Sequence, residues 1–177
     1  FHSAEVEEVV VENNTLSFDD YLNCRIMNLL VKLYVDHDHF SEILGVIRKY
    51  KFSVFQILLL LKEQILPKYP SLMDVVNSFV EHSKKPLFDS YEEINKFVSD
   101  VENVKGYMSG KYGQNELSNH RVRAYMDHMD DLYDALKEAV IMYLKNKNAL
   151  TSDLENYFEE AVTISKNRKF NFNNYSN

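Results

Sequence analysis

The most regular part of the chain is NELSNHRVRAYMDHMDDLYDALKEAVIMYLKNK, residues 115–147. Apolar side chains recur in it at alternating steps of four and three residues, which predicts one long helix with a heptad seam. The seam residues are Val122, Met126, Met129, Tyr133, Leu136, Val140 and Tyr143. A second apolar stripe, from Tyr125 to Met142, runs beside the seam. A face this wide indicates a helix that packs against two or more neighbours, as in a bundle.

The seam has two interpretations. It can belong to the intramolecular core, which we favour because a domain of this size must bury apolar surface along its most regular helix. It can instead be an interface through which two copies of the chain form a homodimer. Both interpretations predict the same helix and differ only in what covers it.

The composition agrees with a helical fold. The chain has 177 residues, of which 45% are hydrophobic and 27% charged, with only four glycines and three prolines. Enough apolar surface is present for a core, which excludes a disordered chain, and the scarcity of turn residues disfavours β-sandwiches and barrels. A net charge of -7 argues against non-specific nucleic-acid binding, so we expect no nucleic-acid partner.

Capping signals divide the rest of the chain into elements. N-cap serines predict helix starts at Ser17, Ser53, Ser90 and Ser152, all but Ser53 with acidic residues in the following turn, and Pro67 ends one helix. The predicted helices cover residues 17–36, 40–50, 54–66, 72–83, 91–107, 115–147 and 152–167. The fold class is therefore all-α, a multi-helix bundle of about seven helices. Gly106, Gly110 and Gly113 predict a flexible loop before the long helix.

The N-terminal segment differs from the bundle. Residues 5–12 are rich in valine and predict one short β-strand or extended segment, which has no partner strand elsewhere in the sequence. Residues 1–20 contain six acidic and no basic residues, so the remainder is nearly neutral. We therefore expect residues 1–16 to be an acidic linker or strand from an upstream domain, 17–169 the bundle and 170–177 a frayed tail.

The chain contains one cysteine and no long apolar run. Cys24 alone excludes an internal disulfide and a cysteine-held metal cluster, and its apolar surroundings predict a small buried side chain. This usage fits a cytoplasmic protein. The longest aliphatic run, Ile57 to Leu61, is far below the ~20 residues of a transmembrane helix, so we expect no membrane partner.

Two histidine motifs have the spacing of metal ligands. His37 and His39 flank Asp38 at a predicted helix end, where Asp36 and His39 are three residues apart. Glu116 and His120 lie four residues apart at the start of the long helix. We favour structural roles for both, the first as a polar turn and the second as an i,i+4 pair. For His128 we likewise favour a structural histidine over a general acid–base. The sequence alone therefore assigns no catalytic, cofactor or metal-binding residue.

The segment Val9-Val10-Val11-Glu12, followed by Thr15-Leu16-Ser17-Phe18-Asp19-Asp20-Tyr21 and Arg25, resembles a junction in cobalamin-binding radical SAM enzymes. There a strand closes the catalytic barrel, and an acidic-aromatic segment opens a C-terminal helical region. The continuation in residues 28–34 is similar too, and the match covers about residues 5–45. The resemblance implies an accessory domain that packs on the upstream catalytic domain of the same polypeptide, where it shapes substrate access or assembly.

The family's cofactor motifs are absent from this sequence. Neither the cluster-binding CxxxCxxC nor the cobalamin-binding DxHxxG occurs. The resemblance therefore implies that the parent protein holds the iron–sulfur cluster, S-adenosylmethionine and cobalamin, and no residue of this chain inherits a role. The alternatives are a free-standing interaction module that dimerises through the seam, and a small metal-binding or catalytic bundle that uses the histidine motifs.

Overall fold

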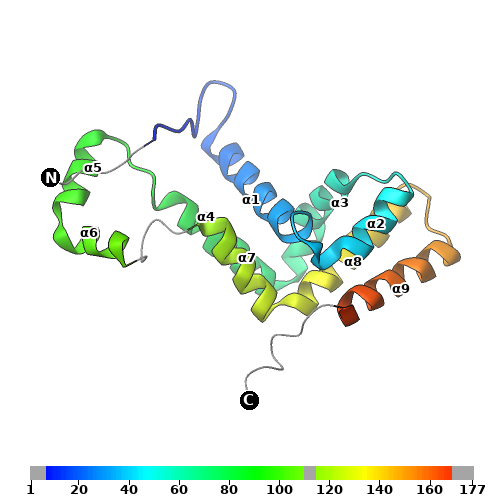
Figure 1. Cartoon of the computed structure of the whole chain (residues 1–177). Helices are drawn as coiled ribbons and strands as arrows, with labels where there is room; N and C mark the ends of the chain where they lie inside the picture. Colours follow the sequence, from blue (N-terminus) through cyan, green and yellow to red (C-terminus); the bar gives the residue numbers. More distant parts are fainter. Residues whose placement is uncertain (1–6, 110–114, 169–177) are drawn as a thin grey trace, which may run out of the picture.

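The computed structural model describes residues 7–109 and 115–168, and within them the chain is all α-helical, with nine α-helices and no β-strand (Figure 1). The α-helices are α1 (Phe18–Tyr34), α2 (Ser41–Lys49), α3 (Val54–Leu60), α4 (Pro70–Lys84), α5 (Tyr91–Ser99), α6 (Val101–Met108), α7 (Glu116–Asp127), α8 (Met129–Asn146) and α9 (Ser152–Arg168). The predicted all-α bundle is confirmed. The predicted number of helices is too low by two, because two predicted helices are each divided.

The long helix predicted for residues 115–147 is interrupted at His128, whose backbone leaves the helical region at φ -138°, ψ 28°. Neither proline nor glycine causes this break. The two halves have different main neighbours: α7 packs mainly on α1 and α4, whereas α8 packs mainly on α3 with the turn that follows it and on α9. Tertiary packing therefore overrides a continuous helical pattern.

The helix predicted for residues 91–107 is divided at Asp100. Its backbone is extended, and its side chain accepts a hydrogen bond from the Glu102 amide at 2.9 Å, which caps α6. The helix predicted for residues 54–66 keeps its length but changes geometry. A π-helical turn, Leu61–Ile65, follows α3, and a 3₁₀ turn, Leu66–Lys68, comes next. Pro67 lies inside the 3₁₀ turn, and the π-helical turn lies directly before it.

The predicted caps are largely confirmed. Ser17 and Asp20 form a reciprocal capping box at the start of α1, and Ser53 and Ser90 each accept an amide hydrogen bond at the start of α3 and α5. The prediction of Ser152 as a cap is wrong by one residue. Thr151 Oγ1 accepts the hydrogen bond of the Leu154 amide at 3.2 Å.

The strand predicted for residues 5–12 is not found among residues 7–12, which belong to no regular element. No partner strand exists in the described residues, so nothing there can complete a ladder. Residues 1–6, the predicted tail 170–177 and the glycines at 110 and 113 lie outside the described residues.

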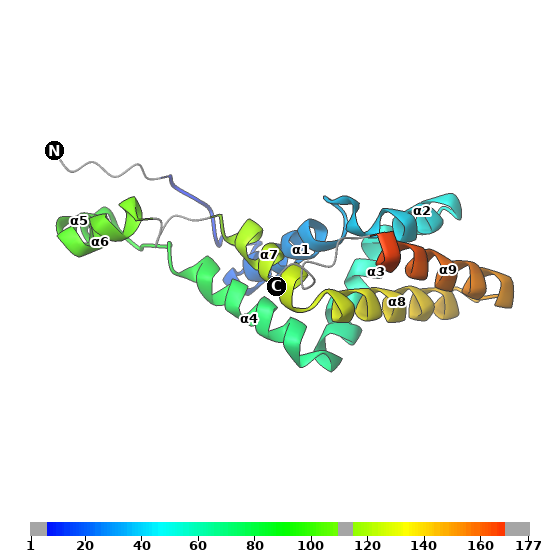
Figure 2. The same cartoon turned by 60° about the horizontal axis from the view of Figure 1, so that its bottom comes forward.

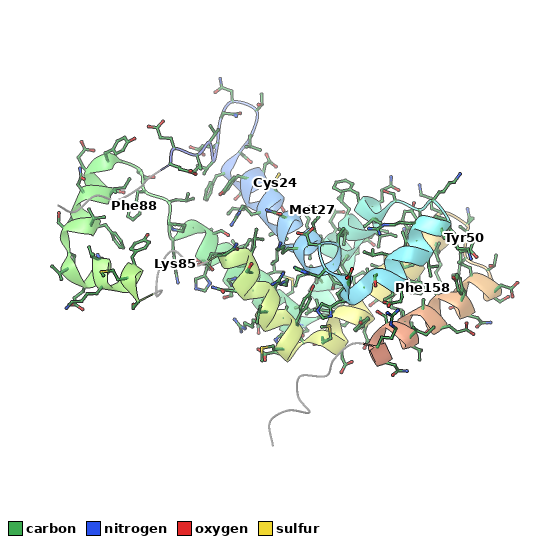
Figure 3. All side chains as sticks on the ribbon, in the orientation of Figure 1. Cys24, Met27, Tyr50, Lys85, Phe88 and Phe158 are labelled. Atoms are coloured by element: carbon green, nitrogen blue, oxygen red, sulfur yellow. The ribbon has the colours of Figure 1, made fainter. Side chains whose placement is uncertain are left out.

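A single hydrophobic core joins α1–α4 with α7–α9. Figure 2 shows these helices gathered on one side of the molecule, with α2, α8 and α9 side by side. Helices α5 and α6 project from the opposite end and meet at a corner, and we call this pair the arm (residues 91–108). No side chain of α5 is buried. Phe97 packs instead on Phe88, which lies three residues before the arm and is labelled in Figure 3, with ring centroids 5.3 Å apart.

Cys24 lies on α1 with its side chain exposed, so its predicted burial is wrong (Figure 3). It occupies the solvent side of α1, whereas Leu22, Leu29 and Leu33 face the core. Among the described helices, none combines the length and the apolar character needed to cross a bilayer.

Candidate metal centre

The arm leaves the bundle at the end of α4 and returns at the start of α7, and these two helices pack against each other. Leu72, Val75 and Phe79 bury one face of α4. His82 follows Phe79 by three residues and therefore lies on the same side of the helix. On α7, the Asn115 side chain caps the helix by accepting from the Ser118 amide at 3.1 Å, which places Glu116 in the first turn.

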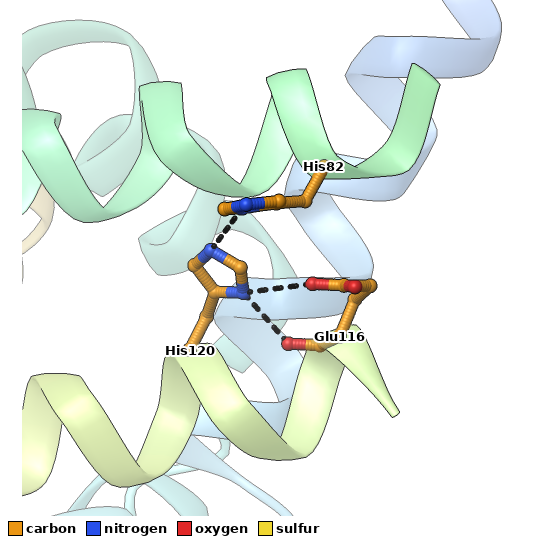
Figure 4. A group of neighbouring side chains, drawn as sticks. All are labelled: His82, Glu116 and His120. Atoms are coloured by element: carbon orange, nitrogen blue, oxygen red, sulfur yellow. Dashed lines mark hydrogen bonds and ion pairs between the residues drawn. The ribbon is translucent and has the colours of Figure 1, made fainter. Parts of the chain in front are cut away.

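The packing of α4 on α7 brings His82, Glu116 and His120 together (Figure 4). His82 Nδ1 and His120 Nε2 are 3.3 Å apart. His120 Nδ1 lies 2.8 Å from the backbone carbonyl oxygen of Glu116 and 3.7 Å from its carboxylate. One ligand atom from each of the three side chains lies within 4.8 Å of the other two.

The hydrogen bonds determine which nitrogen of His120 carries the proton in the neutral ring. The Glu116 carbonyl can only accept, so Nδ1 of His120 donates to it and Nε2 keeps its lone pair. That lone pair points at His82 Nδ1. The hydroxyl of Ser78 lies 3.3 Å from His120 Nε2 and 3.4 Å from His82 Nδ1, so three polar atoms face one another.

The surroundings of this cluster are apolar on one side and open on the other. His120 is 5% exposed, and its ring meets the edge of Phe79 at a centroid distance of 5.4 Å. The guanidinium of Arg25 covers the Phe79 ring at 5.2 Å. His82 and Glu116 are half-buried and so can be reached from solvent.

Two imidazoles and a carboxylate can together coordinate a metal ion, share a proton or hold two helices together by hydrogen bonds. Within the described ranges this is the only group of three histidine, cysteine or acidic side chains with metal-ligand spacing. Its members come from α4 and α7, and the Ser78 hydroxyl of α4 also faces the cluster.

Of the residues with metal-ligand spacing in the sequence, the structure brings together only Glu116 and His120. His37 instead accepts a hydrogen bond from Arg121 through Nε2. Partial burial makes the largest contribution to lowering the pKa of His37, and the Arg121 and Lys32 cations lower it further. The ring of His39 packs against Tyr125 at 4.5 Å, so the two histidines serve different contacts.

His82 was not identified from the sequence. A signal was nevertheless present, because His82 follows Val75 by seven and Phe79 by three residues and so continues the apolar stripe of α4. A histidine in such a stripe faces other helices rather than solvent. What the sequence could not show is that α7 is the helix it faces.

The seam residues separate at the His128 break. Tyr133, Leu136, Val140 and Tyr143 are buried in the intramolecular core, and Met129 packs partly against it. These side chains are therefore inside the fold rather than on a surface. Val122 and Met126 on α7 are 46% and 53% exposed.

Comparisons with known proteins give no family for this fold. No protein-family model, no curated protein and no solved structure matches the chain.

Proposed function

We propose that this chain is a non-catalytic helical accessory domain that packs, through its arm, against the catalytic domain of a cobalamin-dependent radical SAM enzyme in the same polypeptide. The contact between the arm and the N-terminal segment supports this proposal most directly. The hydroxyl of Tyr91, the first residue of α5, donates a hydrogen bond to the carboxylate of Glu8 at 3.2 Å. A domain joined to residues 7–12 would therefore lie within reach of the arm.

The surface at this end of the molecule also supports the proposal. Several large apolar side chains on the N-terminal segment and the arm are more than half exposed: Val9, Val10, Tyr91, Val101 and Met108. Met108 is 85% exposed. Phe55, Met126 and Ile164 are also more than half exposed, but each lies on a different helix. Several exposed apolar side chains on adjoining segments are typical of a surface that another domain covers.

The proposed role is packing rather than chemistry. Iron–sulfur cluster, S-adenosylmethionine and cobalamin would be bound by the parent enzyme, and no residue of this chain is assigned to them. The arm and the segment before α1 would contact the catalytic domain, and the bundle would hold the arm in place. Such a domain shapes substrate access or assembly.

The first test is the reading frame upstream of Phe1. The proposal requires a CxxxCxxC motif there, because the resemblance implies that this motif binds the iron–sulfur cluster of the parent enzyme. A frame that encodes no such motif overturns the radical SAM assignment. If the motif is present, hydrogen exchange of the longer polypeptide should show residues 91–108 more protected than in this chain alone, and equal exchange would overturn the packing role.

Exposure of Val122 and Met126 favours one alternative, a free-standing interaction module that dimerises through this part of the seam. They lie one turn apart on the outer side of α7 and are both about half exposed. Light scattering separates the two proposals. A dimer that the Met126→Glu substitution converts to monomers would favour the interaction module, whereas a monomeric chain would exclude it.

A further inference from the structure

We propose that His82, Glu116 and His120 bind one divalent transition-metal ion of the zinc type, at the point where the arm joins the bundle. This site is independent of the accessory role proposed above. Two imidazole nitrogens and a carboxylate oxygen suit Zn²⁺ and its neighbours Co²⁺, Ni²⁺ and Cu²⁺. Mg²⁺ and Ca²⁺ prefer oxygen ligands alone and do not fit this donor set.

The distance between the two imidazoles fits a tetrahedral ion. Nitrogen ligands lie about 2.0–2.1 Å from Zn²⁺, so two of them in a tetrahedral site are about 3.3–3.4 Å apart. His82 Nδ1 and His120 Nε2 are separated by 3.3 Å. These atoms could bind one ion with little movement of either helix.

The carboxylate of Glu116 has to move to complete the site. The three ligand atoms lie within 4.8 Å of one another, whereas two ligands of one tetrahedral Zn²⁺ are about 3.3–3.4 Å apart. The carboxylate lies 3.7 Å from His120 Nδ1, so it must turn toward Nε2 and His82. The side chain of Glu116 is 30% exposed and lies in the first turn of α7, so rotation about its own bonds can supply the difference. Water can occupy the fourth position, because the cluster is open to solvent on this side.

The position of His120 is already fixed in the way that metal-binding histidines require. Such histidines nearly always donate their second ring N–H to a carbonyl or carboxylate, which orients the ring. His120 does so through Nδ1, at 2.8 Å from the Glu116 carbonyl. The ring is 5% exposed and packed on Phe79, so its Nε2 lone pair is held toward His82.

The facing ring nitrogens need either a proton or a cation between them. Two neutral imidazoles that meet through their lone pairs repel each other, and the Ser78 hydroxyl has only one proton to donate. The contact is satisfied either by a proton on His82 Nδ1 or by a metal ion between the nitrogens. The experiment below distinguishes these two arrangements.

The site has a mechanical role because of its place in the chain. His82 precedes the arm and Glu116 follows it, so an ion bound by both closes a loop of more than thirty residues. Fixing the ends of a long loop removes conformational entropy from the unfolded chain. The metal would thus hold the end of α4 on the start of α7 and steady the base of the arm.

Metal binding is tested on the whole 177-residue chain, with Zn²⁺ by titration calorimetry and with Co²⁺ by visible absorption, which reports tetrahedral coordination. We expect one equivalent of either metal to bind. The His82→Gln and Glu116→Gln substitutions, at half-buried positions, should weaken binding by about 100-fold or more, since loss of a supporting hydrogen bond alone costs about 10–100-fold. The matched controls His128→Gln and Glu81→Gln should bind as the unsubstituted chain does.

Absence of stoichiometric binding would overturn the metal site and leave a proton-shared histidine pair. Equal losses in the variants and their controls would also overturn it, because they would indicate scattered surface binding. The mechanical role has a separate readout. Zn²⁺ should slow hydrogen exchange at residues 80–84 and 116–120, and binding without that protection would overturn the role but not the site.

Discussion

The hydroxyl of Tyr133 on α8 donates a hydrogen bond to the backbone carbonyl of His39, 94 residues earlier in the chain, at 2.8 Å. The hydroxyl of Ser165 on α9 donates to the same carbonyl at 2.8 Å and lies 3.1 Å from the Tyr133 oxygen. Both side chains are buried. One carbonyl in the turn before α2 therefore ties together three parts of the bundle.

Removing the Tyr133 hydroxyl should destabilise the fold. The Tyr133→Phe substitution keeps the ring on Phe40, at 4.8 Å, but leaves the His39 carbonyl with one donor instead of two. We expect the free energy of unfolding to fall by about 1–2 kcal/mol in urea denaturation. Tyr143→Phe is the control, because its hydroxyl makes only a 3.4 Å contact with the Ser53 amide. Equal losses in both variants would contradict this assignment.

A glycine at position 51 should stabilise the protein. Lys51 has φ 58° just after α2, in a Schellman arrangement in which the Phe52 amide donates to the Ile47 carbonyl at 3.0 Å. A side chain in this left-handed region costs about 1 kcal/mol that glycine avoids. Lys51→Gly should therefore raise the melting temperature. Asn148→Gly should give a smaller gain, because asparagine tolerates its φ of 52°; a larger gain at position 148 would refute the explanation.

Two phenylalanines provide a test of where the core lies. Phe158 on α9 is 1% exposed, whereas Phe55 on α3 is 59% exposed. Phe158→Ala should lower the free energy of unfolding by about 3–5 kcal/mol, since it leaves a cavity. Phe55→Ala should change it by less than about 0.5 kcal/mol. If both lowered stability alike, α3 would have to be buried more deeply than the structure has it.

His37 should make the stability depend on pH. Its pKa is lowered from 6.5 by partial burial and then by the Arg121 and Lys32 cations, while Asp36 and Asp38 oppose the shift. The unfolded chain therefore takes up the proton more readily than the folded chain. The stability should fall as the pH drops below the ordinary histidine value, and the loss should level off below the folded-state pKa.

The His37→Gln substitution isolates this contribution. The loss of stability between about pH 8 and about pH 5 should be smaller in the variant than in the unsubstituted chain, as measured by urea midpoints. The carboxylates and the other histidines titrate in both proteins, so their contributions to the pH dependence of stability cancel in the comparison. Identical pH profiles would show that protonation of His37 does not affect folding.

The sequence predicted well those elements that local interactions determine. Ser17, Ser53 and Ser90 satisfy amides in their own first turns, so a few neighbouring residues suffice to locate the helix starts. The break at His128 was missed because no local signal marks it. The two helices on either side of it have different main packing partners, and that packing depends on residues distant in sequence.

The candidate metal centre could likewise be predicted only in part from the sequence. Glu116 and His120 are four residues apart on one helix, so their proximity follows from helical geometry alone. His82 joins them from α4, 38 residues before His120, and only the packing of α4 on α7 brings it there. Its place in an apolar stripe indicated that it faces another helix, but not which one.

The separation of arm and core bears on how this chain can vary. The arm is inserted in the chain between α4 and α7, which pack against each other. A short turn from Lys84 to Asn115 would therefore connect the helices of the bundle without the arm. Insertions and deletions among related sequences should therefore concentrate between these two residues. The same position offers a place to splice in a reporter domain or a binding hairpin while the remaining seven helices keep their arrangement.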